Sequence, residues 1–375
     1  MSVADILAQA RDGRRISPAD ALLLYREGEF IHLGAAANAV RRAQNDPATA
    51  TYLVDRNINY TNVCITDCLF CAFYRPPGHA EAYVLSREEF ARKIDELRAI
   101  GGTRILLQGG HHPDLRLEWY EDLLKWLKAE YPDVEANAFS PSEVTHIAEV
   151  EKLPLEEVLR RLAAAGLKGL PGGGAEILDD AVRDEISPKK LKTAGWLEAM
   201  RLAHKHGLAT TASMVIGFGE SYEHRVNHLV RLRELQDESL AKHGNGFTAF
   251  ISWTAQLDTV PMSGLVRRKG LRPAGAQEYL RNIAVARLFL DNFRHHSASW
   301  PTQGVAIAQV ALNAGCDDYG STMMEENVVS QAGNSTMSSI VVEEMQLQIR
   351  EAGFVPAQRD TRYKILKRDG VEAEV

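Results

Sequence analysis

The chain has little of what marks secreted, membrane-spanning or nucleic-acid-binding proteins. Its 375 residues include only four cysteines, three of them within eight residues, which argues against a disulfide framework. No apolar run approaches the length of a membrane span, and residues 1–10 lack the apolar core of a signal peptide. The net charge of −7 argues against a broad nucleic-acid-binding surface. We therefore expect a cytoplasmic protein, in a reducing compartment, with no membrane or nucleic-acid partner.

A repeating pattern begins near residue 51, where a short apolar stretch is followed by a loop and then by an amphipathic segment. Strands are expected at residues 52–57, 103–107, 134–139, 167–170, 209–216, 247–253, 296–300 and 317–320. Helices are expected at residues 87–100, 117–130, 155–165, 190–206, 222–242, 274–292, 302–314 and 334–352.

Eight strand–helix units predict an α/β fold of the (β/α)8 TIM-barrel type, with an open doubly wound sheet as the alternative. Three parts are expected: an N-terminal helical extension (1–50), the barrel (51–353) and a C-terminal strand with a polar tail (354–375). The active site of such a barrel lies at the C-terminal ends of its strands. The sequence places there the cysteine stretch, Gln108-Gly109-Gly110, Gly172-Gly173-Gly174, Gly217-Phe218-Gly219, Trp253 and Trp300.

The clustered cysteines are Cys64, Cys68 and Cys71. Three thiolates can hold three corners of a four-iron cluster and leave the fourth iron open to a ligand. A structural zinc site completed by His79 or Cys316 is an alternative, although zinc sites usually pair two Cys-x2-Cys knuckles and the second is missing here. An iron–sulfur carrier is another alternative. Cys316 is remote in sequence, and core packing is its expected role.

The spacing Cys-x3-Cys-x2-Cys, with Phe70 just before Cys71, resembles the signature of the radical S-adenosylmethionine (SAM) superfamily. The resemblance implies a radical SAM barrel that binds a 4Fe-4S cluster through Cys64, Cys68 and Cys71. It also implies that SAM is a co-substrate, cleaved by the reduced cluster to a 5′-deoxyadenosyl radical.

The same resemblance suggests which residues contact SAM. Gln108, Gly109 and Gly110 correspond to the motif that contacts the SAM amino group, although an ordinary tight turn would look alike. Glu176, after the triple glycine, is the candidate for the SAM ribose. Weaker candidates are Ser140, and Ile216 or Phe218 for an apolar surface against the adenine; a core strand is the alternative for the latter pair.

Longer stretches resemble the dehypoxanthine futalosine cyclases of the menaquinone pathway. They are residues 57–64, 71–75, 108–114, 299–304 and 320–330, and the similarity spans roughly residues 50–355. Aminofutalosine synthases and the deazaflavin (F420-precursor) synthase subunit are close relatives. The histidine pair after Gly110 and Tyr74-Arg75 favour the cyclase. Ser252 and His296 depart from the family pattern, at what we expect to be the substrate end of the barrel.

The resemblance implies that the radical removes hydrogen from the sugar C4′ of dehypoxanthine futalosine and that the carbon radical then adds to the benzoate ring. Loss of an electron and a proton restores the aromatic ring. The residues expected to position the substrate or take the proton are His111, His112, Arg75, Gln256, Asp317 and Glu325. Arg75 suits a benzoate through bidentate pairing. A low-potential electron donor such as flavodoxin or ferredoxin is implied as a partner.

Overall fold

The computed structural model describes residues 1–325, 327, 331 and 339–373. Eight parallel strands lie side by side in chain order. They are β2 (Asp55–Asn59), β3 (Arg104–Gln108), β4 (Glu135–Ala138), β5 (Gly169–Leu170), β6 (Ala209–Ile216), β7 (Phe247–Thr254), β8 (His295–Ser297) and β9 (Asp318–Ser321). The strand expected at 209–216 is confirmed to the residue, whereas β5 and β8 are shorter than expected.

The sheet curls until its first strand meets its last. β1 (Thr49–Leu53) pairs in parallel with β9 and runs through Val54 into β2, which pairs with β3. Arg56 of β2 also forms a parallel bridge with Met324, just beyond β9. The single first strand expected at 52–57 is therefore two strands, and the predicted TIM-type barrel is confirmed.

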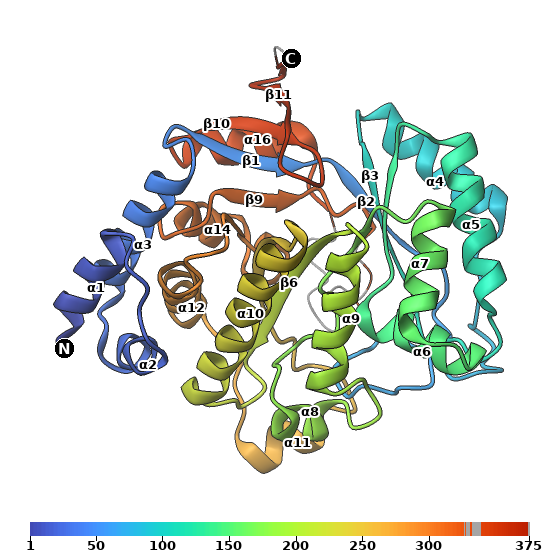
Figure 1. The fold of residues 1–375 in the computed structure, drawn as a ribbon, viewed down its shortest axis with the longest axis horizontal. Helices are drawn as coiled ribbons and strands as arrows, with labels where there is room; N and C mark the ends of the chain where they lie inside the picture. The colour runs from blue at the N-terminus through green and yellow to red at the C-terminus, as the bar shows by residue number, and fades with distance from the viewer. Residues whose placement is uncertain (326, 328–330, 332–338, 374–375) are drawn as a thin grey trace.

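Helices surround the strands in Figure 1. Those that follow the expected pattern are α4 (Arg87–Ala99), α5 (Leu117–Glu130), α7 (Leu155–Ala165), α9 (Thr193–Lys205), α10 (Tyr222–His243), α12 (Ala276–Phe289), α13 (Trp300–Gln303), α14 (Val305–Leu312) and α16 (Val342–Glu351). Three were not predicted: α6 (Pro141–Glu151), α8 (Asp180–Ile186) and α11 (Ser263–Lys269). Residues 334–338 of the expected 334–352 helix lie outside the described part of the chain, as do several residues of the 320–330 stretch.

Both ends of the chain pack against the barrel. α1 (Val3–Arg11), α2 (Pro18–Glu27) and α3 (Phe30–Gln44) lie beside α10 and α12, on the left of Figure 1. At the other end, β10 (Val355–Arg359) pairs in parallel with β1, and β11 (Ile365–Arg368) and β12 (Val371–Glu372) continue antiparallel. The tail therefore has more sheet than the one strand expected. In the described part of the chain, no helix is long and apolar enough to cross a membrane.

The C-terminal segment covers the N-terminal ends of the last barrel strands. Arg359 binds the Asp318 carboxylate through Nε and Nη2, at 2.6 and 3.0 Å. The ring of Tyr363 stacks on His295, with 3.6 Å between ring centroids. Because Asp318 and His295 begin β9 and β8, this segment closes the end of the barrel opposite the cysteine loop.

Candidate functional site

The cysteine loop leaves the C-terminal end of β2 and is held by backbone hydrogen bonds. The Cys64 amide donates to the Arg75 carbonyl at 2.9 Å, and the Cys71 amide donates to the Cys68 carbonyl at 3.1 Å. Between these points, the Leu69 carbonyl accepts a hydrogen bond from the Thr259 hydroxyl at 2.7 Å. The loop is thus tied both to itself and to the segment that follows β7.

The three thiols lie close enough to influence one another. Cys64 and Cys68 are buried, and Cys71 is half-buried. Burial raises the pKa of Cys68 to about 11, and a negative charge on Cys71 acts in the same direction. Burial also raises the pKa of Cys71, with Cys64 adding to it, while the Lys190 ammonium opposes both shifts. Bound iron reverses this balance because it holds thiols as thiolates.

No group of three or more His, Cys, Asp or Glu side chains in the described ranges is placed to hold a single metal ion. A four-iron cluster has a different requirement, since each thiolate binds its own iron and the sulfurs need not converge on one point. Three neighbouring thiols on one fixed loop, with a cation beside them, fit such a cluster.

The glycine motif at the end of β3 packs directly against this loop. The Gly110 amide donates to the Thr61 carbonyl at 3.0 Å. A Cβ at Gly110 would lie 2.1 Å from the Val63 carbonyl oxygen and 2.8 Å from Cys64 Cβ, so no larger residue fits. Without a side chain, Gly110 lets the end of β3 lie directly against the backbone of the cysteine loop.

The buried carboxyl group of Glu143 holds the glycine motif in place through hydrogen bonds. Its Oε1 accepts hydrogen bonds from the Gly109 amide and the Tyr60 hydroxyl, both at 2.9 Å. Burial raises the pKa of this carboxyl to about 7, although its hydrogen bonds, Ser140 first among them, oppose the shift. Glu143 lies in the first turn of α6, and Ser140 caps that helix.

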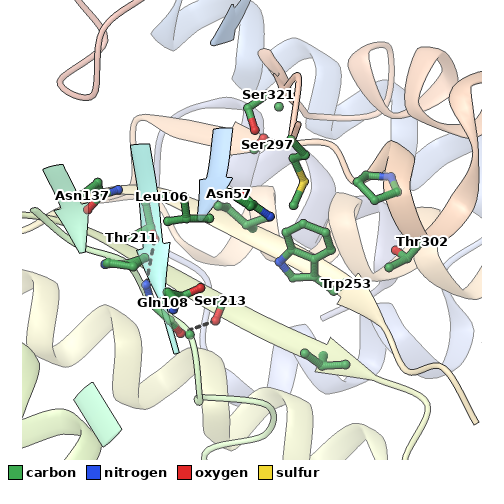
Figure 2. A pocket seen from close by; sticks show the side chains of 18 of the residues that line it. Asn57, Leu106, Gln108, Asn137, Thr211, Ser213, Trp253, Ser297, Thr302 and Ser321 are labelled. Carbon is green, nitrogen blue, oxygen red and sulfur yellow. Dashed lines mark hydrogen bonds between the residues drawn. The ribbon is translucent and has the colours of Figure 1, made fainter. Parts of the chain in front are cut away.

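A cavity of about 330 Å³ runs through the barrel below the cysteine loop. Figure 2 shows polar side chains from several strands that point into this cavity, together with the aromatic ring of Trp253. Those from β2, β3, β4 and β6 are Asn57, Gln108, Asn137, Thr211 and Ser213. Two aromatic rings, Phe70 from the cysteine loop and Phe218 after β6, line the same cavity with centroids 5.3 Å apart.

A buried ionic group connects this cavity to the cysteines. Glu176 lines the cavity, and its carboxylate lies 2.9 Å from Lys190 Nζ and 3.5 Å from Arg183 Nη1. Burial alone would lower the pKa of Lys190, but the Glu176 carboxylate and the nearby Cys68 raise it, so the side chain is a cation. Its Nζ also lies 5.5 Å from the centre of the Phe70 ring.

The residues predicted to contact SAM are distributed around this end of the cavity. Phe70, Gln108, Glu176 and Phe218 line it. Gly109 and Gly110 lie beside the cysteine loop, and Ser140 is buried as the cap of α6. Ile216 is fully buried, and its neighbour Val215 lines the cavity instead, because successive strand residues face opposite sides of a sheet.

Of the residues predicted to handle the substrate, Gln256 lines the cavity, where its Nε2 donates to the Thr254 carbonyl at 3.2 Å. His111 stacks on His146 with 5.0 Å between ring centroids, and burial lowers its pKa to about 3. The Nδ1 of His112 accepts a hydrogen bond from the Asp114 amide at 3.1 Å. Neither His111 nor His112 is among the residues that line the cavity.

Three other predicted residues lie away from the cavity. Arg75 and Glu325 line a separate pocket near α4, where Arg75 pairs with Glu81 at 2.6 Å and Glu325 pairs with Arg56 at 2.8 Å. The fully enclosed Asp317 is bound by Arg287 and by His295, the latter at 2.6 Å. All three are engaged in ion pairs outside the barrel interior.

The two departures from the family pattern also lie outside the cavity. The Ser252 hydroxyl accepts a hydrogen bond from Asn282 of α12 at 2.8 Å, so it faces the helix layer. His296 is fully buried beside Phe250, with 5.5 Å between ring centroids. Neither residue lines the space where a substrate would lie, contrary to what the sequence led us to expect.

Several residues at the site were not found by sequence reasoning. They are Lys190, Glu143, Arg104, Asn57 and Asn137. A signal was present for the strand residues. Polar side chains recur at every second position in β2 and β6, as Asn57/Asn59 and Thr211/Ser213 do, and such alternation indicates a polar side of an otherwise apolar strand.

A cysteine loop and a glycine motif at the C-terminal ends of parallel barrel strands define the radical SAM class. Residues 58–232 match the model of the radical SAM superfamily, and residues 244–371 match the CofH/MqnC C-terminal region. The chain superposes on a crystal structure of methylornithine synthase (PylB) with a TM-score of 0.71 and 19% identity, over 94% of this chain and 97% of that one.

Two curated relatives cover nearly the whole chain. A cyclic dehypoxanthine futalosine synthase of Halalkalibacterium halodurans is 46% identical over 98% of this chain and 96% of its own. An aminodeoxyfutalosine synthase of Thermus thermophilus is 37% identical over 98% of this chain and 97% of its own. The chain belongs to the radical SAM family that contains these futalosine-pathway enzymes. As an enzyme of this superfamily it binds a 4Fe-4S cluster and SAM, which removes the zinc and carrier alternatives.

Proposed function

We propose that this chain cyclises dehypoxanthine futalosine to cyclic dehypoxanthinyl futalosine in menaquinone biosynthesis. The observation that carries the proposal is the 46% identity, over 98% of the chain, to a protein named for that reaction. The identity to the aminodeoxyfutalosine synthase, over the same share of the chain, is 37%. The cavity beneath the cysteine loop supports the proposal because an intramolecular ring closure needs one substrate held folded in one space.

In this proposal Cys64, Cys68 and Cys71 hold the cluster. When bound, the cluster and SAM supply a 5′-deoxyadenosyl radical, which takes a hydrogen atom from C4′ of the substrate sugar. Gly109 and Gly110 let the backbone approach the cofactor closely, and Glu176 offers carboxylate oxygens to ribose hydroxyls. The Lys190 ammonium beside the loop suits a carboxylate or the anionic cluster.

The rest of the reaction takes place within the substrate. The sugar radical adds to the benzoate ring. As the ring regains its aromaticity, one proton leaves to solvent or a nearby base, and one electron would return to the bound cluster, which is oxidised when SAM is cleaved. The protein must hold sugar and benzoate together and keep water out, and the rings of Phe70, Phe218 and Trp253 line the cavity for that purpose. Among the residues predicted to handle the substrate, Gln256 lines the cavity, and we assign it the orientation of the substrate's sugar or ketone group.

We further propose that the reaction runs in the cytoplasm, with a low-potential donor such as flavodoxin or ferredoxin supplying the electron. We assign the cavity inside the barrel to this small-molecule substrate.

The dependence on the three cysteines can be tested by 5′-deoxyadenosine formation in protein reconstituted anaerobically with iron and sulfide. Cys64→Ala, Cys68→Ala and Cys71→Ala are each expected to abolish it. Cys316→Ala is the matched control, because Cys316 is fully buried and takes no part in the cluster, and it is expected to keep the activity. Deoxyadenosine formation that survives in any of the first three variants would contradict the proposal.

A further inference from the structure

The cavity reaches from the cysteine loop to the opposite end of the barrel, its floor, where two arginines line it and each pairs with a buried aspartate. Arg104 is the first residue of β3, and Gln108 at the other end of the strand is four residues away, about 13 Å at the usual strand rise. Among the described residues that line the cavity, the lysines and arginines are Arg104 and Arg359. Both lie at the floor. Arg359 belongs to the C-terminal segment, and Arg104 lies in β3.

The two arginines differ in how many donors they have free. Arg359 uses Nε and Nη2 on Asp318 and Nη1 on the Asp360 carbonyl, so each of its three side-chain nitrogens has a partner. Arg104 donates from Nη2 to Asp55, and no other acceptor lies within hydrogen-bond distance in the described part of the chain. Its side chain is 11% exposed, so an unengaged guanidinium edge sits at the cavity floor.

Two amides with unpaired oxygens lie two residues further along the strands. Asn57 and Asn137 flank Leu106 in the register of β2, β3 and β4, and both line the cavity. They are 9% and 2% exposed, and neither Oδ1 has a hydrogen-bond partner among the described residues. Buried polar groups are normally satisfied, so three such groups around one space indicate a polar ligand.

The local structure makes room for one of these amides. A Cβ at Gly169 of β5 would lie 2.4 Å from Asn137 Oδ1, so only glycine leaves the amide in place. The barrel floor is therefore shaped around these side chains.

Resting on the proposed function, we propose that Arg104, flanked by Asn57 and Asn137, binds the carboxylate of the substrate's benzoate at the floor of the barrel. Guanidinium donors match carboxylate oxygens, and the amides of Asn57 and Asn137 each also carry Nδ2 donors. The folded substrate then reaches from the floor toward the cysteine loop, with its sugar on the side of Gln108 and the cofactor. Arg75, the residue that the sequence suggested for this task, lies in the other pocket.

The test compares dehypoxanthine futalosine with its analogue in which a primary carboxamide replaces the carboxylate. Dissociation constants are measured by calorimetry on the reconstituted protein. The native chain is expected to bind the acid about 10- to 100-fold more tightly than the amide, since a buried charge-assisted hydrogen bond is lost. Arg104→Gln is expected to weaken acid binding by that factor and to bind acid and amide alike. Arg75→Gln is expected to keep the native preference.

Asp55 is buried and loses its partner in Arg104→Gln, so a double variant, Asp55→Asn with Arg104→Gln, guards against misfolding. The double variant is expected to have the melting temperature and SAM affinity of the native chain but to bind the acid and the amide equally well. The assignment to Arg104 would be overturned if both Arg104 variants still bound the acid more tightly than the amide as the native chain does. It would also be overturned if Arg75→Gln lost this preference. Either result would leave the cyclase proposal standing. A native chain that neither binds nor converts dehypoxanthine futalosine would overturn the proposed function itself.

Discussion

At Gly110, one added methyl group would collide with the loop that carries the cysteines. The built Cβ lies 2.1 Å from the Val63 carbonyl oxygen, a backbone atom that cannot swing aside. Gly110→Ala is expected to displace the loop, to lower stability by about 1–3 kcal/mol, and to lose most of the cluster. Iron and sulfide content after reconstitution measures this. Gly264→Ala in α11 is the control, since its Cβ would meet nothing within 4 Å. Equal iron content in the two variants would contradict the account.

The sequence predicted residues well where a motif fixed their spacing, as for Cys64, Cys68 and Cys71. It predicted them poorly where position depends on barrel closure. Arg104 was read as part of an apolar strand, and Lys190 as the start of a helix, because nothing local shows that both face the barrel interior or the cysteine loop. Contacts across a closed sheet join residues far apart in sequence, and one sequence does not show which ones meet.

At the scale of the element, α6 does more than cover the sheet. Its first turn brings Glu143 under the glycine motif, where the carboxyl accepts hydrogen bonds from Gly109 and Tyr60. The helix has sequence signals, a serine cap and a proline in the first turn, yet no helix was expected between the strand at 134–139 and the helix at 155–165. Because α6 was not expected, the role of Glu143 in holding the glycine motif was not predicted either.

Glu143 makes a pH-dependent contribution to stability. Its pKa in the folded protein is raised to about 7, above the ordinary value of 4.5, so the folded state binds more protons and stability falls as pH rises between these values. Glu143→Gln keeps a hydrogen-bond acceptor without the charge. Its stability relative to the native chain is expected to improve by up to ~3 kcal/mol between pH 5 and pH 8, as followed by thermal melts. Glu149→Gln, on the exposed side of α6, should show no such trend, and an equal trend in both would contradict the role of burial.

At the scale of the whole molecule, barrel closure encloses several histidines in neutral form. Burial lowers the pKa of His204 and of His228 to about 3, and it lowers the pKa of His296 well below its ordinary value. Both His204 ring nitrogens are hydrogen bonded at 2.7 Å, to Ser239 and Thr210. Such groups take up protons only on unfolding, so their contribution to stability is lost as pH falls below the ordinary value near 6.5.

We therefore expect the melting temperature of the protein to drop steeply between pH 6.5 and pH 4.5. Each histidine contributes about 1.4 kcal/mol per pH unit in this range, and together the three outweigh the opposite trend of Glu143. Calorimetric melts across the range measure the effect. A melting temperature that stays level from pH 7 to pH 5 would contradict it.

The fold as a whole was the most predictable feature. Strand–helix alternation is a local signal repeated eight times, and it specifies a barrel even though single boundaries shift. The C-terminal segment was less predictable, because β11 and β12 are short and polar and its role at the barrel floor comes from Arg359 and Tyr363 reaching β9 and β8.

The central claim is that the chain closes a ring within one substrate and adds nothing to it. Mass spectrometry of the products from dehypoxanthine futalosine, SAM and a reductant tests this most directly. The account predicts a product two hydrogen atoms lighter than the substrate, with one free 5′-deoxyadenosine for each product formed. A product that carries the adenosyl group, or free deoxyadenosine with the substrate unchanged, would contradict it.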